Sequence, residues 1–199
     1  MGLREKQKAS RNRAIVEAAS RLFQESGYEA ARIGQIAELA EVSVGTLYNY
    51  FKSKADLLLA IVSLEVEEVL HQGKAVLEED PKTASDAVYR LASIYYDHSL
   101  VYLTKEMWRT AMALAIQHPD TPFSDRYHML DAALAQQVKD LCEGLRARGL
   151  LRPEVDPDAL GEALFLSING LFTAFTVSDQ MTLEDLRTTV ARHIRAICG

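Results

Sequence analysis

The sequence predicts an all-α protein of about nine helices, with a three-helix N-terminal domain and a larger helical C-terminal domain. Apolar residues recur at three- and four-residue spacing along most of the 199 residues, and no stretch alternates as a half-buried strand would. All five prolines lie after residue 80, where each separates two helical segments. The composition, 48% hydrophobic and 25% charged, is typical of a globular chain that buries a core.

The first predicted helix ends shortly before residue 28. Ile15, Ala18 and Leu22 share one face of this helix. Ser10 is suited to cap its N-terminus, and Gly27 is a typical C-terminal residue. We therefore expect a helix from about residue 10 to Gly27.

Two short helices follow, and a tight turn joins them. The apolar pattern predicts a helix over 33–40, a turn at 41–43 and another helix over 44–50. Ser43 stands where the second of these helices needs an N-cap. We expect a domain boundary after this unit, dividing the chain into domains 1–54 and 55–199.

Six further helices are expected in the C-terminal domain. Ser53 and Thr83 are the expected N-caps of the first two, in positions that favour a hydroxyl acceptor. The predicted segments begin near Lys54 and continue as 84–103, 105–117, 123–148, 158–177 and 183–197.

Two short helices joined by a tight turn, with a longer helix on either side, form a helix-turn-helix layout. Such a unit places its second helix in the major groove of DNA. Thr46, Tyr48 and Asn49 offer hydrogen-bonding groups on that helix, and Lys52 and Lys54 follow with charges suited to phosphate. The same layout also occurs as two packed helices in bundles that never contact DNA.

The charge of the chain is unevenly distributed. Its net charge is −6, but residues 1–54 carry nine basic and six acidic side chains, a net +3. The remaining residues carry 13 basic and 22 acidic side chains, a net −9. Nucleic acid is therefore expected to contact the N-terminal end and not the acidic body. The five basic residues among the first thirteen are open to two interpretations, a DNA contact or a solubilising tail.

Residues 14–62 resemble the DNA-binding domain of the tetracycline-repressor (TetR) family. The segments that carry the resemblance are AASRLFQESGYEA, IAELAEVSVGTLYNYF and KSKADLL. The family resemblance implies a dimeric, ligand-responsive transcriptional repressor that binds a near-palindromic double-stranded DNA operator. It also implies that the C-terminal domain binds the ligand and forms the homodimer.

The resemblance assigns roles to individual residues of the helix-turn-helix. Val44, Gly45, Thr46 and Asn49 are expected to face base edges, and Tyr48 and Lys54 to bind backbone phosphates. The full predicted DNA-binding set is Arg32, Gln35, Ser43, Val44, Gly45, Thr46, Tyr48, Asn49 and Lys54.

Three positions depart from the family pattern. Arg32 stands where Ser or Thr usually caps the second helix, so that cap is lost or supplied otherwise, and Arg32 can itself reach a phosphate. Glu41 replaces a frequent glycine, so a left-handed backbone there would cost about 1 kcal/mol. Val44 replaces a commonly polar residue and favours contact with a thymine methyl group.

A largely apolar effector pocket is expected among the middle helices, lined mainly by aromatic side chains. A neutral or cationic hydrophobic effector suits such a lining better than a strongly anionic one. His98 is also compatible with a satisfied core histidine, and the stripe of Met107, Trp108 and Met112 with ordinary core packing. The predicted lining residues are Tyr95, His98, Trp108, Met112, Tyr127, Phe165 and Phe172.

The last two predicted helices each carry an apolar stripe at helical spacing, and Ser167 and Gly170 permit close approach. Two such stripes suit a two-fold four-helix interface, although one stripe must partly pack inside its own subunit. The predicted interface residues are Leu164, Ile168, Leu171, Leu186, Val190 and Ile194.

Enzymatic chemistry is not expected, because the sequence has no nucleophile elbow, glycine-rich phosphate loop or paired histidines at metal spacing. We expect no cofactor and no metal. Cys142 and Cys198 suggest a reducing compartment, with a single disulfide left open. The lack of a long apolar run or signal pattern predicts a cytoplasmic protein without a membrane segment. Two alternatives stay open: a helical scaffold that never touches DNA, and an activator instead of a repressor.

Overall fold

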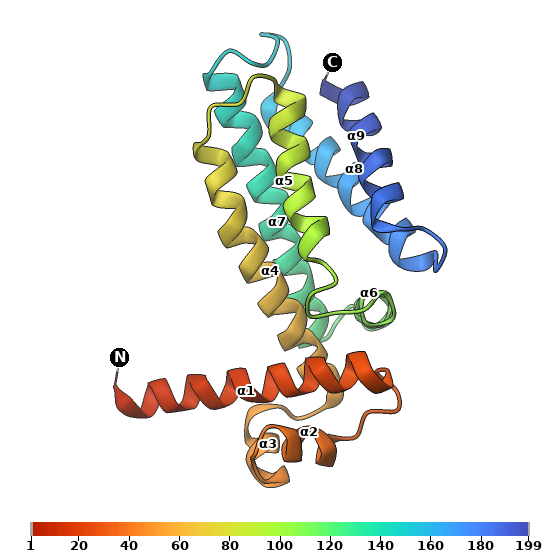
Figure 1. The fold of residues 1–199 in the computed structure, drawn as a ribbon. Coiled ribbons are helices and arrows are strands. Elements are labelled where there is room, and N and C mark those ends of the chain that lie inside the picture. Colours follow the sequence, from red (N-terminus) through yellow and green to blue (C-terminus); the bar gives the residue numbers. More distant parts are fainter. Residues whose placement is uncertain (1, 199) are drawn as a thin grey trace. The chain divides into compact units, whose positions relative to one another are not determined.

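The computed structural model describes residues 2–198, and within that range the chain forms nine α-helices and no strand (Figure 1). The all-α prediction is confirmed. The helices are α1 (Leu3–Ser26), α2 (Ile33–Leu39), α3 (Val44–Tyr50), α4 (Lys54–Glu78), α5 (Ala84–His98), α6 (Lys105–Gln117), α7 (Pro122–Ala147), α8 (Pro157–Val177) and α9 (Leu183–Cys198).

The helices form two compact units. Unit 1 comprises the residues up to Glu65 together with Val101–Tyr127, and unit 2 comprises Val66–Leu100 together with the residues from His128 onward. These units are defined by packing. The boundary predicted after residue 54 separates functions, and it stays a prediction.

The first helix of unit 1 is longer than predicted. α1 begins at Leu3, where the Glu5 carboxylate accepts a hydrogen bond from the backbone N–H of Gly2 at 3.0 Å. Ser10 therefore lies inside the helix, and its assignment as the N-cap was wrong. No glycine or proline interrupts residues 3–26, so the sequence offers no reason to begin later. Gly27 ends the helix at a φ of 82°, as predicted.

The second half of α1 provides the core of the N-terminal helices. Ile15, Ala19 and Phe23 are fully buried or nearly so, and α1 packs against α2, which packs against α3. On another side of α1, the Ser20 hydroxyl donates to the carbonyl of Tyr102 at 2.6 Å. These contacts fix α1 between the helix-turn-helix and the segment that precedes α6.

Unit 2 is a helical bundle in which α9 packs against both α5 and α8. Its core includes Leu91, Leu164 and Val190, each fully buried. Two tyrosines of α5 are buried with their hydroxyl groups satisfied. The hydroxyl of Tyr96 donates to the backbone carbonyl of Ile168 at 2.9 Å, and burial raises the pKa of this phenol. A buried hydroxyl with a hydrogen-bond partner fixes the position of one helix against another and avoids the free-energy cost of an unsatisfied polar group.

Capping side chains explain where most helices of the C-terminal half begin. The hydroxyl of Thr83 accepts from the N–H of Asp86 at 3.1 Å, and that of Ser53 accepts from Asp56 at 3.1 Å, which confirms both predicted caps. α5 ends at His98, five residues before the predicted end. There the chain leaves the helix, and Thr104 caps α6 instead by accepting from Met107.

Among the helices in the described range, α8 alone has the length and composition of a segment able to cross a membrane. Core helices of soluble proteins pass the same test. α8 buries Leu164, Ile168 and Phe175 in the core of unit 2, and 33% of its most apolar window is buried.

Candidate DNA interface

The helix-turn-helix is held together by a small apolar core. Ile36 and Ala37 of α2 and Leu47 of α3 are each at most 1% exposed. The backbone N–H of Val42 donates to the carbonyl of Ala37 at 2.9 Å and closes the turn after α2. Because Leu47 anchors α3 from within, the opposite side of this short helix is left to solvent.

The turn requires an unusual backbone at Glu41. Its φ is 54°, the only positive φ of a non-glycine residue in the described range. The left-handed conformation is costly for a residue with a Cβ atom, and glycine adopts it freely. The left-handed backbone whose cost the sequence analysis considered at Glu41 is therefore present in the structure.

Both short helices are capped, but in different ways. The hydroxyl of Ser43 accepts from the N–H of Thr46 at 3.0 Å and lies 2.8 Å from the Thr46 hydroxyl, so its predicted N-cap role is confirmed. At α2, the side-chain carbonyl of Gln35 accepts from the N–H of Arg32 at 3.2 Å. Gln35 therefore supplies the reciprocal bond of a capping box, and the Arg32 guanidinium remains exposed.

α3 presents an unusual surface for so short a helix. The large side chains of Val44 and Tyr48 are 44% and 50% exposed, and Asn49 is exposed beside them. A Cβ atom added at Gly45 would meet only the Ser43 hydroxyl, at 3.9 Å. Packing inside the chain therefore gives no reason for a glycine in this helix. Close approach of an external partner would give one.

Lys54 is engaged inside the chain. Its ammonium group donates to the backbone carbonyls of Tyr28 at 2.7 Å, Glu29 at 2.9 Å and Ala31 at 3.4 Å, and lies 4.6 Å from the centre of the Tyr28 ring. Burial, followed by the charges of Glu29 and Asp56, raises the pKa of Tyr28. Lys54 thus joins the first turn of α4 to the α1–α2 loop. A phosphate contact by the same ammonium, as the sequence suggested, stays a prediction.

Comparison with known families gives two matches. Residues 15–61 match the family described as bacterial regulatory proteins, tetR family, and residues 104–199 match the C-terminal domain of BetI-type transcriptional repressors. The transcriptional repressor KstR of Rhodococcus jostii is 30% identical over 157 residues, which cover 79% of this chain and 68% of that protein. The chain belongs to the TetR family. It is accordingly a DNA-binding transcriptional regulator, ligand-responsive and dimeric as repressors of the family are.

Two further comparisons extend over nearly the whole length of this TetR-family regulator. The fatty acid metabolism regulator protein of Bacillus subtilis is 26% identical over 183 residues, 88% of each chain. A solved structure of the regulator FadR from Bacillus subtilis, in complex with stearoyl-CoA, has a TM-score of 0.69 at 19% identity and covers 94% of this chain and 97% of that one. The second likeness shows the fold. The matched families are transcription regulators, which are generally not enzymes.

The residues predicted to line an effector pocket are divided between the two units. Trp108, Met112 and Tyr127 belong to unit 1, whereas the other four belong to unit 2. His98 Nε2 lies 3.2 Å from the Glu68 carboxylate, in line with the alternative of a satisfied histidine. The Tyr95 hydroxyl donates to the side chain of Gln137 at 2.8 Å. Phe165 and Phe172 pack against the core of unit 2. The pocket stays a prediction.

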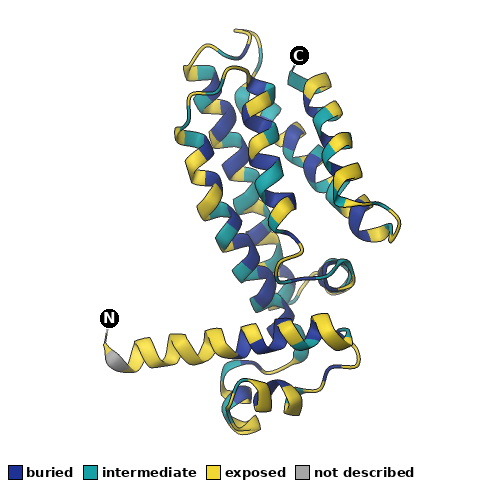
Figure 2. Ribbon diagram, viewed as in Figure 1, coloured by how far each residue is buried: buried dark blue, intermediate teal, exposed yellow. Residues whose placement is uncertain are grey.

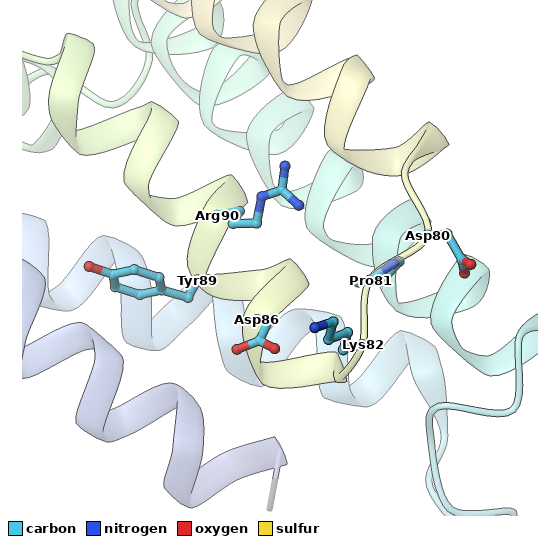
Figure 3. A pocket seen from close by; sticks show the side chains of 6 residues that line it. All are labelled: Asp80, Pro81, Lys82, Asp86, Tyr89 and Arg90. Carbon is cyan, nitrogen blue, oxygen red and sulfur yellow. The ribbon is translucent and has the colours of Figure 1, made fainter.

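Two hollows on unit 2 have other linings. One, of about 390 Å³, lies at the α4–α5 loop, and its charged lining residues are Asp80, Lys82, Asp86 and Arg90 (Figure 3). The other, of about 560 Å³, lies between α4 and α7 and includes residues such as Glu67, Lys74 and Asp140. Neither hollow contains a residue of the predicted pocket, and both have charged rims.

Five of the six residues predicted to form the dimer interface are buried inside their own protomer. Leu164, Ile168, Leu186, Val190 and Ile194 are at most 3% exposed, and Leu171 is partly buried against the same core. The stripe chosen from the sequence is therefore the one that packs α8 and α9 into unit 2. In this conformation these side chains are not available to a second copy.

Sequence reasoning missed a second stripe on α8. Its members are exposed and recur at three- and four-residue spacing, which places them on one face of the helix. Leu166 and Val177 are 64% and 65% exposed. The same spacing in the sequence could have revealed this face, but most of its members are small and did not look like an apolar stripe. The members are Ala159, Ala163, Leu166, Gly170, Ala174 and Val177.

Proposed function

We propose that this regulator binds a near-palindromic operator as a homodimer and inserts α3 of each protomer into the major groove. The observation that carries the proposal is the exposed face of α3. On this helix, Val44, Tyr48 and Asn49 face solvent, whereas Leu47 is fully buried. Ser43 caps the helix, and packing within the chain does not explain why residue 45 is a glycine. Two such helices reach successive half-sites if they stand about 34–36 Å apart.

Individual roles follow from chemistry and exposure. Val44 suits a thymine methyl group, and Thr46 and Asn49 suit base edges. Gly45 permits the close approach of α3 to the groove. Tyr48 and Arg32 are exposed and suit phosphate oxygens. Gln35 and Ser43 support these contacts by capping α2 and α3, and Lys54 remains a candidate phosphate ligand that also orders the α1–α2 loop.

The homodimer is proposed to form through the exposed apolar stripe of α8 and not through the residues first selected. Small side chains at Ala163, Gly170 and Ala174 let two helices approach closely, and Leu166 and Val177 provide apolar area. A two-fold axis brings this stripe against the same stripe of a second copy. The high apolar content of α8 is then explained on both of its faces.

The effector is proposed to be a small hydrophobic molecule that binds the C-terminal helices and changes the separation of the two reading helices. A ligand acts only through different affinities for the two separations. A long-chain acyl-CoA is a second candidate, because a fatty acid metabolism regulator matches 88% of this chain and a structural neighbour was solved with stearoyl-CoA. Since its target is DNA, we place the protein in the cytoplasm.

The DNA-binding proposal is tested by selecting bound duplexes from a random pool with the wild-type protein. An enriched sequence with two-fold symmetry is expected. Gly45→Ala should then raise the free energy of unfolding by up to about 1 kcal/mol, because alanine favours helix more than glycine. The same variant should bind the selected duplex at least tenfold more weakly. If it binds the duplex as well as the wild type, α3 does not approach DNA as proposed.

The effector proposal is tested with the fluorescence of Trp108, the one tryptophan of the chain, which is 7% exposed. Neutral and cationic hydrophobic compounds, free fatty acids and stearoyl-CoA are titrated in parallel, with coenzyme A alone as the control. A compound that changes the fluorescence and releases the selected duplex identifies the effector class. If stearoyl-CoA is the only compound that releases the selected duplex, the effector is an acyl-CoA and not a neutral or cationic hydrophobic molecule.

A further inference from the structure

The first half of α1 lies at the surface of the protein. Every side chain from Arg4 to Ala14 is exposed, whereas the second half is largely buried on one face (Figure 2). This segment, residues 4–14, is called the basic arm below. It carries five basic residues and one acid, Glu5, whose carboxylate caps the start of the helix. A helical segment that buries no apolar face contributes little to folding stability, so folding does not account for its cluster of basic residues.

The basic arm holds the positive charge of the DNA-binding region. Residues 15–54, which include the whole helix-turn-helix, carry four basic and five acidic side chains, a net −1. Of these four, Arg21 pairs with Glu25 at 2.8 Å and Lys54 donates to three backbone carbonyls. The rest of the chain after residue 54 has a net charge of −9. A duplex approaching α3 would be repelled overall if the arm did not attract it.

The arm has two distinct sides. At 100° per residue, Arg4, Lys8 and Arg11 continue the stripe of the buried Ile15. Lys6 and Arg13 lie about 140–180° away from them, on the side of Ser20 and Gln24. Ser20 and Gln24 bond to the carbonyls of Tyr102 and Val101. Figure 1 shows α2 and α3 on one side of α1 and α6 on the other.

The stripe of Arg4, Lys8 and Arg11 therefore projects toward the side of the reading helix. These residues stand at i, i+4 and i+7, so neighbouring like charges repel each other in the free helix. A phosphate placed between two of them turns that repulsion into attraction. The arm has no apolar side chain larger than alanine between residues 4 and 14, so it lacks the face that would insert into a membrane surface. Its chemistry fits a nucleic-acid backbone.

We propose that the basic arm is a second DNA-binding element, in which Arg4, Lys8 and Arg11 bind backbone phosphates that flank the sequence read by α3. The arm is about 16 Å long at 1.5 Å per residue, and at about 3.4 Å per base pair it can follow some five base pairs. Its contacts are independent of sequence. This inference rests on the proposed function, since it needs a duplex docked on α3.

The test uses the full-length dimer and two charge-matched double variants. Lys8→Gln/Arg11→Gln removes two charges from the stripe, and Lys6→Gln/Arg13→Gln removes two from the opposite side. Two duplexes are used, the one selected by the wild type and one of unrelated sequence. The dissociation constant for each is measured over about 0.05–0.3 M salt. Loss of two phosphate contacts per protomer should lower the salt slope by about 1.8 units for each arm. The affinity at 0.1 M salt should fall at least tens of fold, equally for both duplexes.

The control pair should change the slope by less than half as much. Arg13 pairs with Glu17 at 2.8 Å, so the substitution of Arg13 leaves the Glu17 carboxylate unneutralised. That negative charge can only weaken DNA binding, so a small effect of the control pair is the more telling result. Shortening the flanks of the selected duplex by about five base pairs at each end should weaken the wild type clearly more than the stripe variant, which keeps only Arg4 of the three stripe residues. Equal salt slopes for the two double variants would contradict the proposed role of the basic arm. A wild type that binds the shortened duplex as tightly as the full one would also contradict it. A wild type that selects no sequence at all would instead reject the proposed function.

Discussion

Glu41 is a single residue at which the fold accepts a local cost. Its φ of 54° lies in the left-handed region, which costs a residue with a Cβ atom about 1–2 kcal/mol. Glu41→Gly should remove this cost but give the unfolded chain more freedom, for a net gain of about 0.5–1 kcal/mol in the free energy of unfolding. Urea denaturation measures the change.

Glu41→Ala is the matched control for this prediction, because it removes the same charge and keeps the Cβ atom. Its stability should not rise. If alanine stabilised the protein as much as glycine, the removal of a negative charge and not the backbone would be the cause.

Lys54 poses a different question at the same scale, namely whether its charge serves the fold or the DNA. Three carbonyl acceptors surround its ammonium group. Lys54→Ala should leave these carbonyls without their charged donor and lower the free energy of unfolding by about 1–3 kcal/mol. Thermal denaturation and the salt slope of DNA binding are measured together.

Lys52→Ala provides the comparison, since Lys52 is exposed and lies only two residues away. It should leave stability unchanged and lower the salt slope by about one unit. A Lys54→Ala variant that resembles this control in both measurements would show that Lys54 acts on phosphate alone. A loss of stability with an unchanged slope would assign it to the fold alone.

At the scale of elements, helix starts with a side-chain cap were predictable from the sequence. Ser43, Ser53 and Thr83 each stand before an apolar pattern and accept the expected backbone hydrogen bond. Ser10 looked equally suitable, but nothing upstream of it stops the helix, and Glu5 caps the chain earlier. A capping residue predicts a helix start only where the preceding residues cannot continue the helix.

The end of α5 shows the converse limit. Its apolar pattern runs on to Leu103, so the periodicity alone extends the helix past its true end at His98. The hydroxyl of Ser99 donates to the carbonyl of Tyr96 at 2.8 Å, and Leu103 is buried although it lies outside the helix. Tertiary packing uses an apolar residue in a connecting segment as readily as in a helix, and a sequence pattern cannot separate the two.

The two cysteines report on the core where the end of α9 meets α7, since Cys142 belongs to the core of unit 2 and Cys198 packs against that core. Burial, followed by the charge of Cys198, raises the pKa of Cys142 in α7 to about 12, and burial also raises the pKa of Cys198 at the end of α9. Because thiolate is the reactive form, a higher pKa slows reaction with a disulfide reagent at pH 8. Native protein should therefore react slowly at Cys142 and faster at the half-buried Cys198.

A Cys198→Ser variant isolates Cys142 for this measurement. Its reaction rate, followed by absorbance of the released thiol, should rise to that of a free cysteine only in denaturant. A Cys142 that reacts at the free rate in native protein would mean that α9 does not cover it in solution.

For the whole molecule, the fold class and the DNA-binding region could be predicted from the sequence, but the surface between subunits could not. α8 carries two apolar faces, one with Leu164 and Ile168 and another with Leu166 and Val177. Helical spacing is compatible with both faces, and it cannot say which one packs into the protomer's own core. The larger side chains drew the prediction to the first face, and the structure buries it. Only the arrangement of α5, α8 and α9 reveals which face is left over.

The dimer is therefore best tested at the exposed face. Leu166→Arg should convert the dimer to monomers at micromolar concentration in sedimentation velocity. In the protomer this side chain is 64% exposed, so arginine costs little there. In a two-fold interface two guanidinium groups would be buried close together without partners, a strongly unfavourable arrangement. Circular dichroism and the thermal midpoint of the monomer should show that its helices remain folded.

Ile116→Arg is the control, since Ile116 is 76% exposed on α6 and the same substitution there should leave the dimer intact. Ile168→Arg with Val190→Arg gives no such contrast, because both residues are buried in their own protomer and arginine would unfold it. DNA binding by Leu166→Arg should fall steeply, because a monomer reaches only one half-site. A Leu166→Arg protein that sediments as the wild-type dimer and binds the selected duplex normally would place the subunit contact on another face of the molecule.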